Sequence, residues 1–241
     1  MKIVRASNYE EMSMKAAKGI IEKVRSKPDI TLGLATGSTP KGVYRCIIED
    51  HKHCGTSYQQ AASVNLDEYI GLDQKDRNSY HSFMCREFFD HIDLPLERAF
   101  IPNGTATDLL TECARYEKTI QALGGIDLQI LGIGHNGHIG FNEPGTPFTS
   151  RTHVVSLAES TRQANSRFFT SVDEVPTSAI TMGIATILDS AEIYLLASGS
   201  SKADAIARLI GGDADEQFPA SALKLHKNVT IFADEDALNL I

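Results

Sequence analysis

The fourteen residues Gly132–Gly145 contain five glycines, two histidines and one glutamate, a combination that could carry acid–base chemistry. Histidine has the side-chain pKa closest to neutrality, and a nearby carboxylate can fix its orientation. Glycines allow the backbone to turn sharply and to approach a ligand closely. The segment follows the apolar run Ile126–Leu131, which is typical of a buried strand. Because open α/β sheets bind ligands at the carboxyl ends of their strands, the sequence predicts a catalytic loop here.

Three other interpretations of this loop remain open. Gly132, Gly134 and Gly137 fit the G-x-G-x-x-G dinucleotide fingerprint, but the helix and the later acidic residue that this motif requires are missing. His135 and His138 could bind a metal ion, although no third ligand stands at a recognisable spacing. The glycines could also form a turn with only a structural role.

Residues Thr36–Pro40 follow the apolar run Ile30–Ala35 and precede a helical pattern. We expect Pro40 at the first helical position and Ser38 or Thr39 as the helix cap. Free N–H groups at the start of a helix attract anions, so the segment is a candidate phosphate site. An ordinary helix cap explains the local sequence equally well. It is not a Walker A loop, because no G-K-[ST] ending is present.

Asp67 follows the buried run Ala61–Leu66, so its side chain should reach the same crevice as the glycine-rich loop. Taken alone, an acidic residue at a strand end is more often structural than catalytic. We expect its neighbour Glu68 to be solvated or paired. Arg167 and Lys202 could complete an anion site, although each taken singly fits a surface charge.

Together these residues favour acid–base chemistry on a small phosphorylated molecule. One group would move a proton at a ring oxygen while a second shuttles a proton at carbon, as ring opening and isomerisation of a sugar phosphate require. No nucleophile stands out, because the chain has no G-x-S-x-G elbow and no cysteine in a glycine-rich turn.

The elements that must position these residues alternate along the chain. Buried strands are expected at 30–35, 61–66, 126–131, 193–197 and 229–233, with a short strand at 152–157. Helices are expected after a capping box formed by Ser7 and Glu10, and near 40–48, 80–88, 109–123, 160–169, 177–188 and 201–210. This alternation predicts an α/β protein with an open, mostly parallel sheet and helices on both faces, in a single domain spanning residues 1–241.

The composition narrows the class of protein further. The net charge of −8 argues against nucleic acid as the main partner. The four cysteines show no metal-binding spacing, so free thiols in a reducing cytoplasm explain them. Neither a signal peptide nor an apolar stretch of membrane-spanning length is present. We therefore expect a soluble cytoplasmic protein with a small-molecule substrate and no membrane partner.

Four segments closely resemble motifs of the glucosamine-6-phosphate deaminases, a family with a Rossmann-like fold. They are Leu34–Pro40, Asn65–Leu72, Gly134–Pro144 and Ala164–Phe169. They occur in the family's order, and the resemblance extends from near the N-terminus to Ala233. It implies conversion of glucosamine 6-phosphate and water into fructose 6-phosphate and ammonia, in amino-sugar catabolism, without a metal or an organic cofactor.

The resemblance also implies a role for each matched residue. His138 would open the pyranose ring, with Asn136 and Glu143 setting its protonation and orientation. Asp67 would move a proton from C2 of the open aldehyde to C1, and the resulting C2 imine would lose ammonia to water. The segment from about 150 to 180 resembles the family's mobile lid. The substrate and phosphate would be held by Thr36, Gly37, Ser38, Thr39, Arg167 and Lys202.

Two departures from the family pattern affect the expected behaviour. Many relatives have Asp in place of Asn136, and an amide cannot stabilise a charged histidine as a carboxylate does. Longer, allosteric members carry basic residues where this chain has His153 and Val155, and they extend beyond the position of Ile241. We therefore expect an unregulated enzyme that is a monomer or a small homo-oligomer.

Two alternative functions compete with the deaminase. A 6-phosphogluconolactonase-like hydrolase has a related fold and a similar Gly-His loop, but it does not need the carbon base that the Asn65–Leu72 motif supplies. A non-catalytic sugar-phosphate sensor would need no such arrangement of Asp67, His138 and Glu143.

Overall fold

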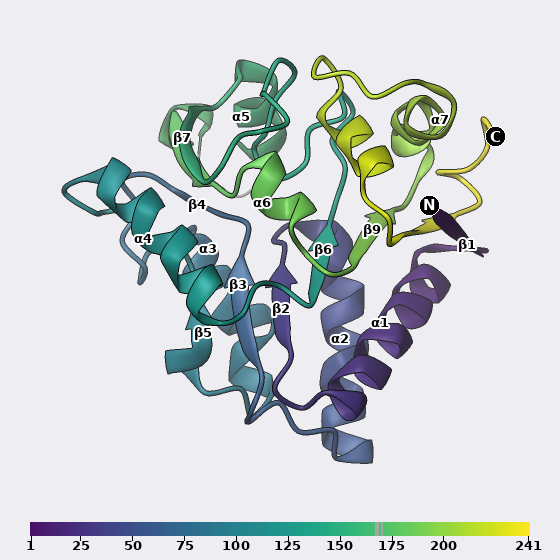
Figure 1. Ribbon diagram of the computed structural model, residues 1–241, viewed down its shortest axis with the longest axis horizontal. Coiled ribbons are helices and arrows are strands. Elements are labelled where there is room, and N and C mark those ends of the chain that lie inside the picture. Colours follow the sequence, from purple (N-terminus) through teal and green to yellow (C-terminus); the bar gives the residue numbers. More distant parts are fainter. Residues whose placement is uncertain (167–168, 170) are drawn as a thin grey trace.

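The computed structural model describes residues 1–166, 169 and 171–241. Within this part of the chain, seven parallel strands form one sheet and three antiparallel strands form another (Figure 1). The large sheet has the order β1 (Lys2–Ala6), β10 (Val229–Asp234), β9 (Ile193–Ala197), β6 (Leu128–Leu131), β2 (Thr31–Leu34), β3 (Ala62–Asn65) and β5 (Ala99–Phe100). The predicted parallel sheet is confirmed, and the five apolar runs are its five inner strands.

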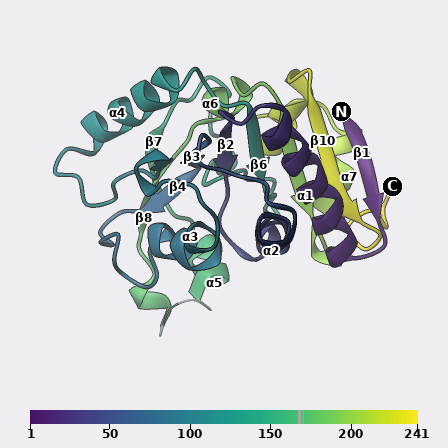
Figure 2. The same cartoon turned by 90° about the horizontal axis from the view of Figure 1, so that it is seen from below.

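The two edge strands, β1 and β5, were not predicted. Lys2 and Arg5 interrupt the apolar pattern of β1, and its residues are largely accessible because only one neighbour, β10, covers it. β5 has only two residues, too few for a hydrophobic pattern. Pairing of β1 with β10 brings the two ends of the chain close together (Figures 1 and 2).

Helices cover both faces of the large sheet, as predicted. Figure 2 shows α2 and α3 on one side of the sheet and α4 and α6 on the other. One buried cluster joins the strands to α1, α2 and α3, and a second joins them to α4, α6 and α7. The helices are α1 (Tyr9–Ser26), α2 (Ser38–Cys54), α3 (Tyr80–Glu87), α4 (Leu109–Ala122), α5 (Glu159–Asn165), α6 (Ile184–Leu188) and α7 (Ala203–Gly211).

The small sheet has the order β4 (Asp67–Tyr69), β8 (Ser178–Thr181) and β7 (His153–Ser156). Leu66 connects the two sheets, because its N–H donates to Leu34 of the large sheet and its carbonyl accepts from Met182, which directly follows β8 of the small one. The predicted strand at 152–157 is confirmed as β7. The chain therefore leaves the parallel sheet immediately before Asp67.

The helix expected at 177–188 is wrong in its first half. Residues 178–181 form β8, the central strand of the small sheet, and only Ile184–Leu188 are helical. A short apolar run fits a buried strand and a buried helix equally well by periodicity. Pairing with β4 on one side and β7 on the other decides in favour of the strand.

Two predicted helix starts are displaced by one or two residues. Asn8, rather than Ser7, caps α1 by accepting the Glu11 N–H, while the Glu11 carboxylate accepts from both the N–H and the hydroxyl of Ser7. Gly37 stands at the cap position of α2, so Ser38 is already helical and Pro40 is the third helical residue. In α1 the neighbouring polar residues Ser7 and Asn8 could each supply the acceptor, which explains the shift by one residue. In α2 neither Ser38 nor Thr39 caps the helix, so the predicted side-chain cap is wrong.

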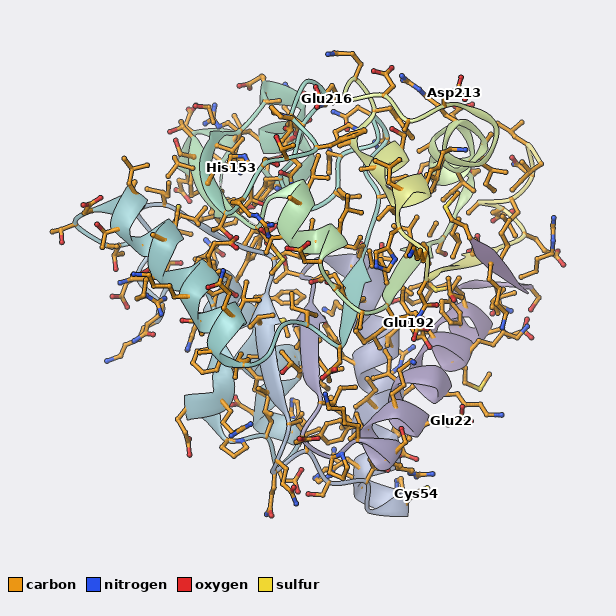
Figure 3. The ribbon with its side chains drawn as sticks, viewed as in Figure 1. Glu22, Cys54, His153, Glu192, Asp213 and Glu216 are labelled. Atoms are coloured by element: carbon orange, nitrogen blue, oxygen red, sulfur yellow. The ribbon has the colours of Figure 1, made fainter. Side chains whose placement is uncertain are left out.

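The four cysteines are all free thiols, as predicted. Cys54 is exposed at the end of α2, on the side of the molecule opposite His153 and the small sheet (Figure 3). No helix in the described ranges combines the length and the apolar character needed to cross a membrane.

Candidate active site

A cleft of about 850 Å³ lies at the carboxyl ends of the central strands of the large sheet. The loops after β2, β6 and β9, together with β4, supply much of its wall. The prediction that Asp67 and the glycine-rich loop share one crevice is confirmed. The residues expected from sequence that line it are Thr36, Gly37, Ser38, Thr39, Asp67, His138 and Lys202.

Asn136 and Glu143 lie behind His138 and hold its ring. The Asn136 amide nitrogen donates to Glu143 Oε2 at 2.6 Å, and Asn136 Oδ1 lies 2.8 Å from His138 Nδ1. A carboxylate can only accept, so the Glu143 contact fixes which way the amide faces. Asn136 Oδ1 must then accept a hydrogen from His138 Nδ1, which leaves Nε2 of a neutral ring unprotonated.

The ring of His138 lies directly against the backbone of Gly134. A side chain at this position would place its Cβ 2.3 Å from two atoms of the imidazole, closer than any real contact. Glycine is therefore required at position 134 by the histidine itself. The sequence alone does not predict this contact between Gly134 and the His138 ring.

The surroundings of His138, burial above all, favour its neutral form. Burial lowers the pKa of His138, the Glu143 carboxylate raises it, and Lys202 and His135 lower it, with a net shift downward. The pKa of His135 is also lowered, chiefly by Lys202. A neutral imidazole with a free Nε2 at the cleft can accept a proton near neutral pH.

Asp67 is the second titratable group in the cleft. It is 6% exposed, and burial, followed by the neighbouring Glu68, raises its pKa to about 8. Among the described residues, no hydrogen-bond donor or cation opposes this shift. A carboxyl group with such a pKa exchanges protons readily at neutral pH, which suits a group that must both take up and release a proton.

Glu68 is buried rather than solvated, so the expectation for this residue is corrected. Its carboxylate accepts the N–H groups of Tyr69, Tyr80 and His81 at 2.8–2.9 Å. Burial raises the pKa of Glu68 to about 7, although the three N–H donors act in the opposite direction. Glu68 thereby fixes the start of α3 to β4, next to Asp67. No local pattern in the sequence predicts this contact between Glu68 and the start of α3.

The loop after β2 has the geometry of an anion site. Gly37 adopts a φ of 98°, a conformation that favours glycine, and no side chain caps α2. The first N–H groups of the helix are therefore left without an internal partner at the cleft. The Tyr9 hydroxyl contacts the carbonyls of Ser38 and Thr39 and accepts the Gly42 N–H, so α1 braces this loop from behind. Sequence reasoning missed Tyr9.

Lys202 reaches the cleft from the short 3₁₀ turn Ser200–Lys202 after β9. Its charge acts on both His135 and His138, which places it near the acid–base loop as well as the anion loop. Arg167, the other predicted basic residue, lies outside the described residues.

An aromatic cluster forms another wall of the cleft. Tyr69 packs against Tyr80, Phe141 and Phe169 at centroid distances of 4.6–5.8 Å, and all four line the cleft. These rings come from β4, α3, the glycine-rich loop and the segment after α5. They line the same cleft as Asp67.

The histidines considered as metal ligands do not converge with other ligands. In the described ranges, no group of three or more His, Cys, Asp or Glu side chains is arranged to hold a metal ion. His138 instead uses Nδ1 for its contact with Asn136.

A parallel α/β sheet with an open helix N-terminus and two perturbed titratable groups at its carboxyl edge defines a class: an enzyme that performs acid–base chemistry on a small anionic molecule. Residues 6–232 match the family described as glucosamine-6-phosphate isomerases/6-phosphogluconolactonase, and the chain belongs to this family. The resemblance seen in the four sequence motifs is thus confirmed.

Individual relatives are similar over the full length. The chain is 58% identical to the glucosamine-6-phosphate deaminase of Halalkalibacterium halodurans, with 100% of this chain and 98% of the relative covered. A solved structure described as a monomeric glucosamine-6-phosphate deaminase superimposes with a TM-score of 0.98 at 55% identity, covering 100% of both chains. The 6-phosphogluconolactonase of Trypanosoma brucei has a TM-score of 0.80 at 19% identity, covering 99% of this chain and 97% of that one, which shows a shared fold alone.

Proposed function

We propose that this enzyme converts glucosamine 6-phosphate and water into fructose 6-phosphate and ammonia. The observation that carries the proposal is the presence, in one cleft, of a neutral histidine, a buried carboxyl group and an anion loop. Full-length identity with glucosamine-6-phosphate deaminases supports the same substrate. The 6-phosphogluconolactonase alternative has weaker support, because the matched family includes both activities but the solved lactonase is only 19% identical to this chain.

His138 acts first, as the base and acid of ring opening. Its Nε2 takes the proton of the anomeric hydroxyl, and the same proton is returned to the ring oxygen as the C1–O5 bond breaks. The Asn136 contact keeps the proton on Nδ1, so that Nε2 is available in each turnover. The product of this step is the open-chain aldehyde.

Asp67 acts second, at carbon. Its ionised carboxylate takes the proton from C2 of the aldehyde and delivers it to C1. A second proton passes from the C2 amine to the carbonyl oxygen at C1, so that the aldehyde becomes a hydroxyl group and the amine becomes an imine. Water adds to the C2 imine, and ammonia leaves to give the ketone of fructose 6-phosphate. The aromatic wall keeps bulk water from Asp67 while it carries the proton.

The phosphate is held by the anion loop and by the basic residues of the cleft. The loop Thr36–Thr39 supplies N–H groups and hydroxyls, and Lys202 supplies a positive charge. Arg167 completes this set in the proposal, on the basis of the sequence motif. The segment from about 150 to 180 serves as a lid, and α5 is the part of it whose Thr161 and Asn165 line the cleft.

The enzyme acts in the cytoplasm as a monomer or a small homo-oligomer without allosteric activation. Its rate should therefore depend hyperbolically on substrate concentration, with or without N-acetylglucosamine 6-phosphate. Initial rates measured across substrate concentrations test this. A sigmoidal curve that N-acetylglucosamine 6-phosphate makes hyperbolic would contradict it.

The decisive test is to mix the purified protein with glucosamine 6-phosphate in the presence of a chelator and to follow both products. Release of ammonia and fructose 6-phosphate in equal amounts supports the proposed reaction without a metal. If neither product appears, calorimetry with the same sugar phosphate separates a sensor, which binds it, from a protein with another substrate. In the latter case hydrolysis of 6-phosphogluconolactone is the next assay.

A further inference from the structure

The short helix α5 contacts the acid–base loop through the hydroxyl of Thr161. This hydroxyl donates a hydrogen bond to Glu143 Oε1 at 2.6 Å. Thr161 is 7% exposed and lines the cleft, and its partner is the carboxylate that also binds the Asn136 amide. Each oxygen of Glu143 therefore has its own donor, one from the loop and one from α5.

The same oxygen of Glu143 is the one nearest to the histidine. Glu143 Oε1 lies 3.7 Å from His138 Nδ1, too far for a good hydrogen bond, while Asn136 Oδ1 occupies the bonding position at 2.8 Å. The Thr161 hydroxyl thus engages the carboxylate oxygen that would otherwise be able to turn toward the ring.

We propose that Thr161 is a positioning residue, which keeps the Glu143 carboxylate from pairing directly with His138 and so maintains the neutral ring bonded to Asn136. The proposal deepens the proposed function, since it concerns the group that opens the sugar ring. It also makes the histidine dependent on α5, because the controlling hydroxyl belongs to that helix.

The electrostatic consequence has a definite sign. The charged or titratable groups that act on His138 are Glu143 and His135 of its own loop and Lys202 of the turn after β9, while α5 contributes the neutral hydroxyl of Thr161. Without this hydroxyl, Glu143 Oε1 is free to approach Nδ1 and to stabilise the imidazolium form. The pKa of His138 should then rise.

A second contact of α5 provides a matched control. The Asn165 side chain, one turn after Thr161, is hydrogen-bonded to the hydroxyl of Tyr69. Replacing Asn165 weakens the attachment of α5 to the cleft but leaves the Thr161–Glu143 contact in place. General loosening of the helix can therefore be distinguished from loss of the specific hydroxyl.

The test is an NMR titration of the His138 imidazole, assigned by the resonance that His138→Gln removes. In Thr161→Val the pKa of His138 should rise by roughly one to two units, the scale of one hydrogen bond to a charged group. Thr161→Ser should restore the wild-type value, and Asn165→Ala should leave it unchanged. If the pKa of His138 is unchanged in Thr161→Val, or rises equally in Asn165→Ala, the proposal is wrong.

A kinetic measurement links the titration to catalysis. The turnover of Thr161→Val relative to wild type should be lower at pH 6 than at pH 8, because a larger fraction of His138 is protonated at the lower pH. The NMR titration needs no substrate, so it decides the role of Thr161 even if glucosamine 6-phosphate is not turned over. Thermal unfolding of each variant shows whether it is folded.

Discussion

The contact of His138 Nδ1 with Asn136 leaves Nε2 free, as the proposed ring opening requires. The Asn136 amide is oriented by Glu143, and the oriented amide accepts the Nδ1 hydrogen. An aspartate at position 136 would bring a negative charge to the same place and would favour the imidazolium form. The amide in this chain orients the histidine ring without adding that charge. The Glu143 carboxylate, which lies further from the ring, raises the pKa of His138.

Replacing Asp67 by Asn should remove most of the turnover. The amide has nearly the same shape but cannot take a proton from C2, so we expect kcat to fall at least ~100-fold, as for loss of a general base. KM should change little, because the group acts mainly in the transition state. Steady-state assays of fructose 6-phosphate formation measure both values.

Asp213→Asn is the matched control for this substitution, since Asp213 is exposed near α7 (Figure 3). It should behave as wild type. If Asp67→Asn kept more than about a tenth of the wild-type kcat, the loss would be too small for a general base, whose removal should lower kcat at least ~100-fold.

Lys202→Ala should act mainly on substrate binding. The side chain supplies a positive charge at the cleft, and a hydrogen bond to a charged group contributes about 1.5–3 kcal/mol. We therefore expect KM to rise roughly 10- to 100-fold, with a smaller change in kcat. The exposed Lys118 of α4 provides the control, because Lys118→Ala should leave both constants unchanged. A fall in kcat with constant KM would assign Lys202 to the chemical steps instead.

At the scale of elements, the site depends on how loops are fixed to strands and helices. Glu68 fixes the start of α3 to β4, and Tyr9 of α1 braces the loop that begins α2. Asp67 lies where the chain passes from the large sheet to the small one, at the junction made by Leu66. Asp67 and the loop before α2 therefore each lie next to a contact that joins two elements.

Glu68→Ala should weaken the junction of α3 with β4. The substitution leaves three buried N–H groups without their acceptor, and each unsatisfied group costs about 1–3 kcal/mol unless water replaces it. We expect a loss of at least ~2 kcal/mol at pH 6, or about 4–8 °C in Tm. Thermal unfolding followed by circular dichroism measures this. Glu97→Ala, at an exposed acidic residue, should shift Tm by far less, and equal shifts would contradict the assigned role of Glu68.

At the scale of the whole molecule, the fold buries a carboxyl group, that of Asp67, whose ionisation opposes stability. Burial raises the pKa of Asp67 from 3.8 to about 8. Below pH 4 the group is protonated in both the folded and the unfolded chain and has no net effect. Between pH 4 and pH 8 the unfolded chain releases the proton more readily, so the folded state loses stability as the pH rises. The two large hydrophobic clusters on the sheet faces offset this loss.

Asp67→Asn should therefore stabilise the protein in a pH-dependent manner. Since one pKa unit corresponds to about 1.4 kcal/mol, the shift sets an upper bound of about 6 kcal/mol at pH 8. We expect the variant to gain at least ~2 kcal/mol at pH 8, or about 4–8 °C in Tm, and little at pH 4. Thermal unfolding of both proteins at the two pH values tests this. A stabilisation that is constant with pH would show that ionisation of Asp67 is not its cause.

Much of the fold and part of the site could be predicted from the sequence, because they depend on local patterns. Five largely apolar runs marked the inner strands, since strands buried on both faces are mostly apolar. Parallel strands bring their carboxyl ends to one edge, so Asp67, His138 and the anion loop were expected to meet there, and they line one cleft. Strands β1, β4, β5 and β8 escaped prediction, because pairing with neighbours, rather than their own pattern, makes them strands.

The sequence by itself determined which chemical groups stand at the strand ends, since residue type and hydrophobic spacing are local properties. The tertiary structure alone decided how those groups are held and ionised. Thr161 and Glu143 are 18 residues apart, and Tyr9 and Ser38 are 29 apart, so their hydrogen bonds leave no local pattern. The raised pKa of Asp67 and the lowered pKa of His138 follow chiefly from burial, which arises only when distant segments close around them.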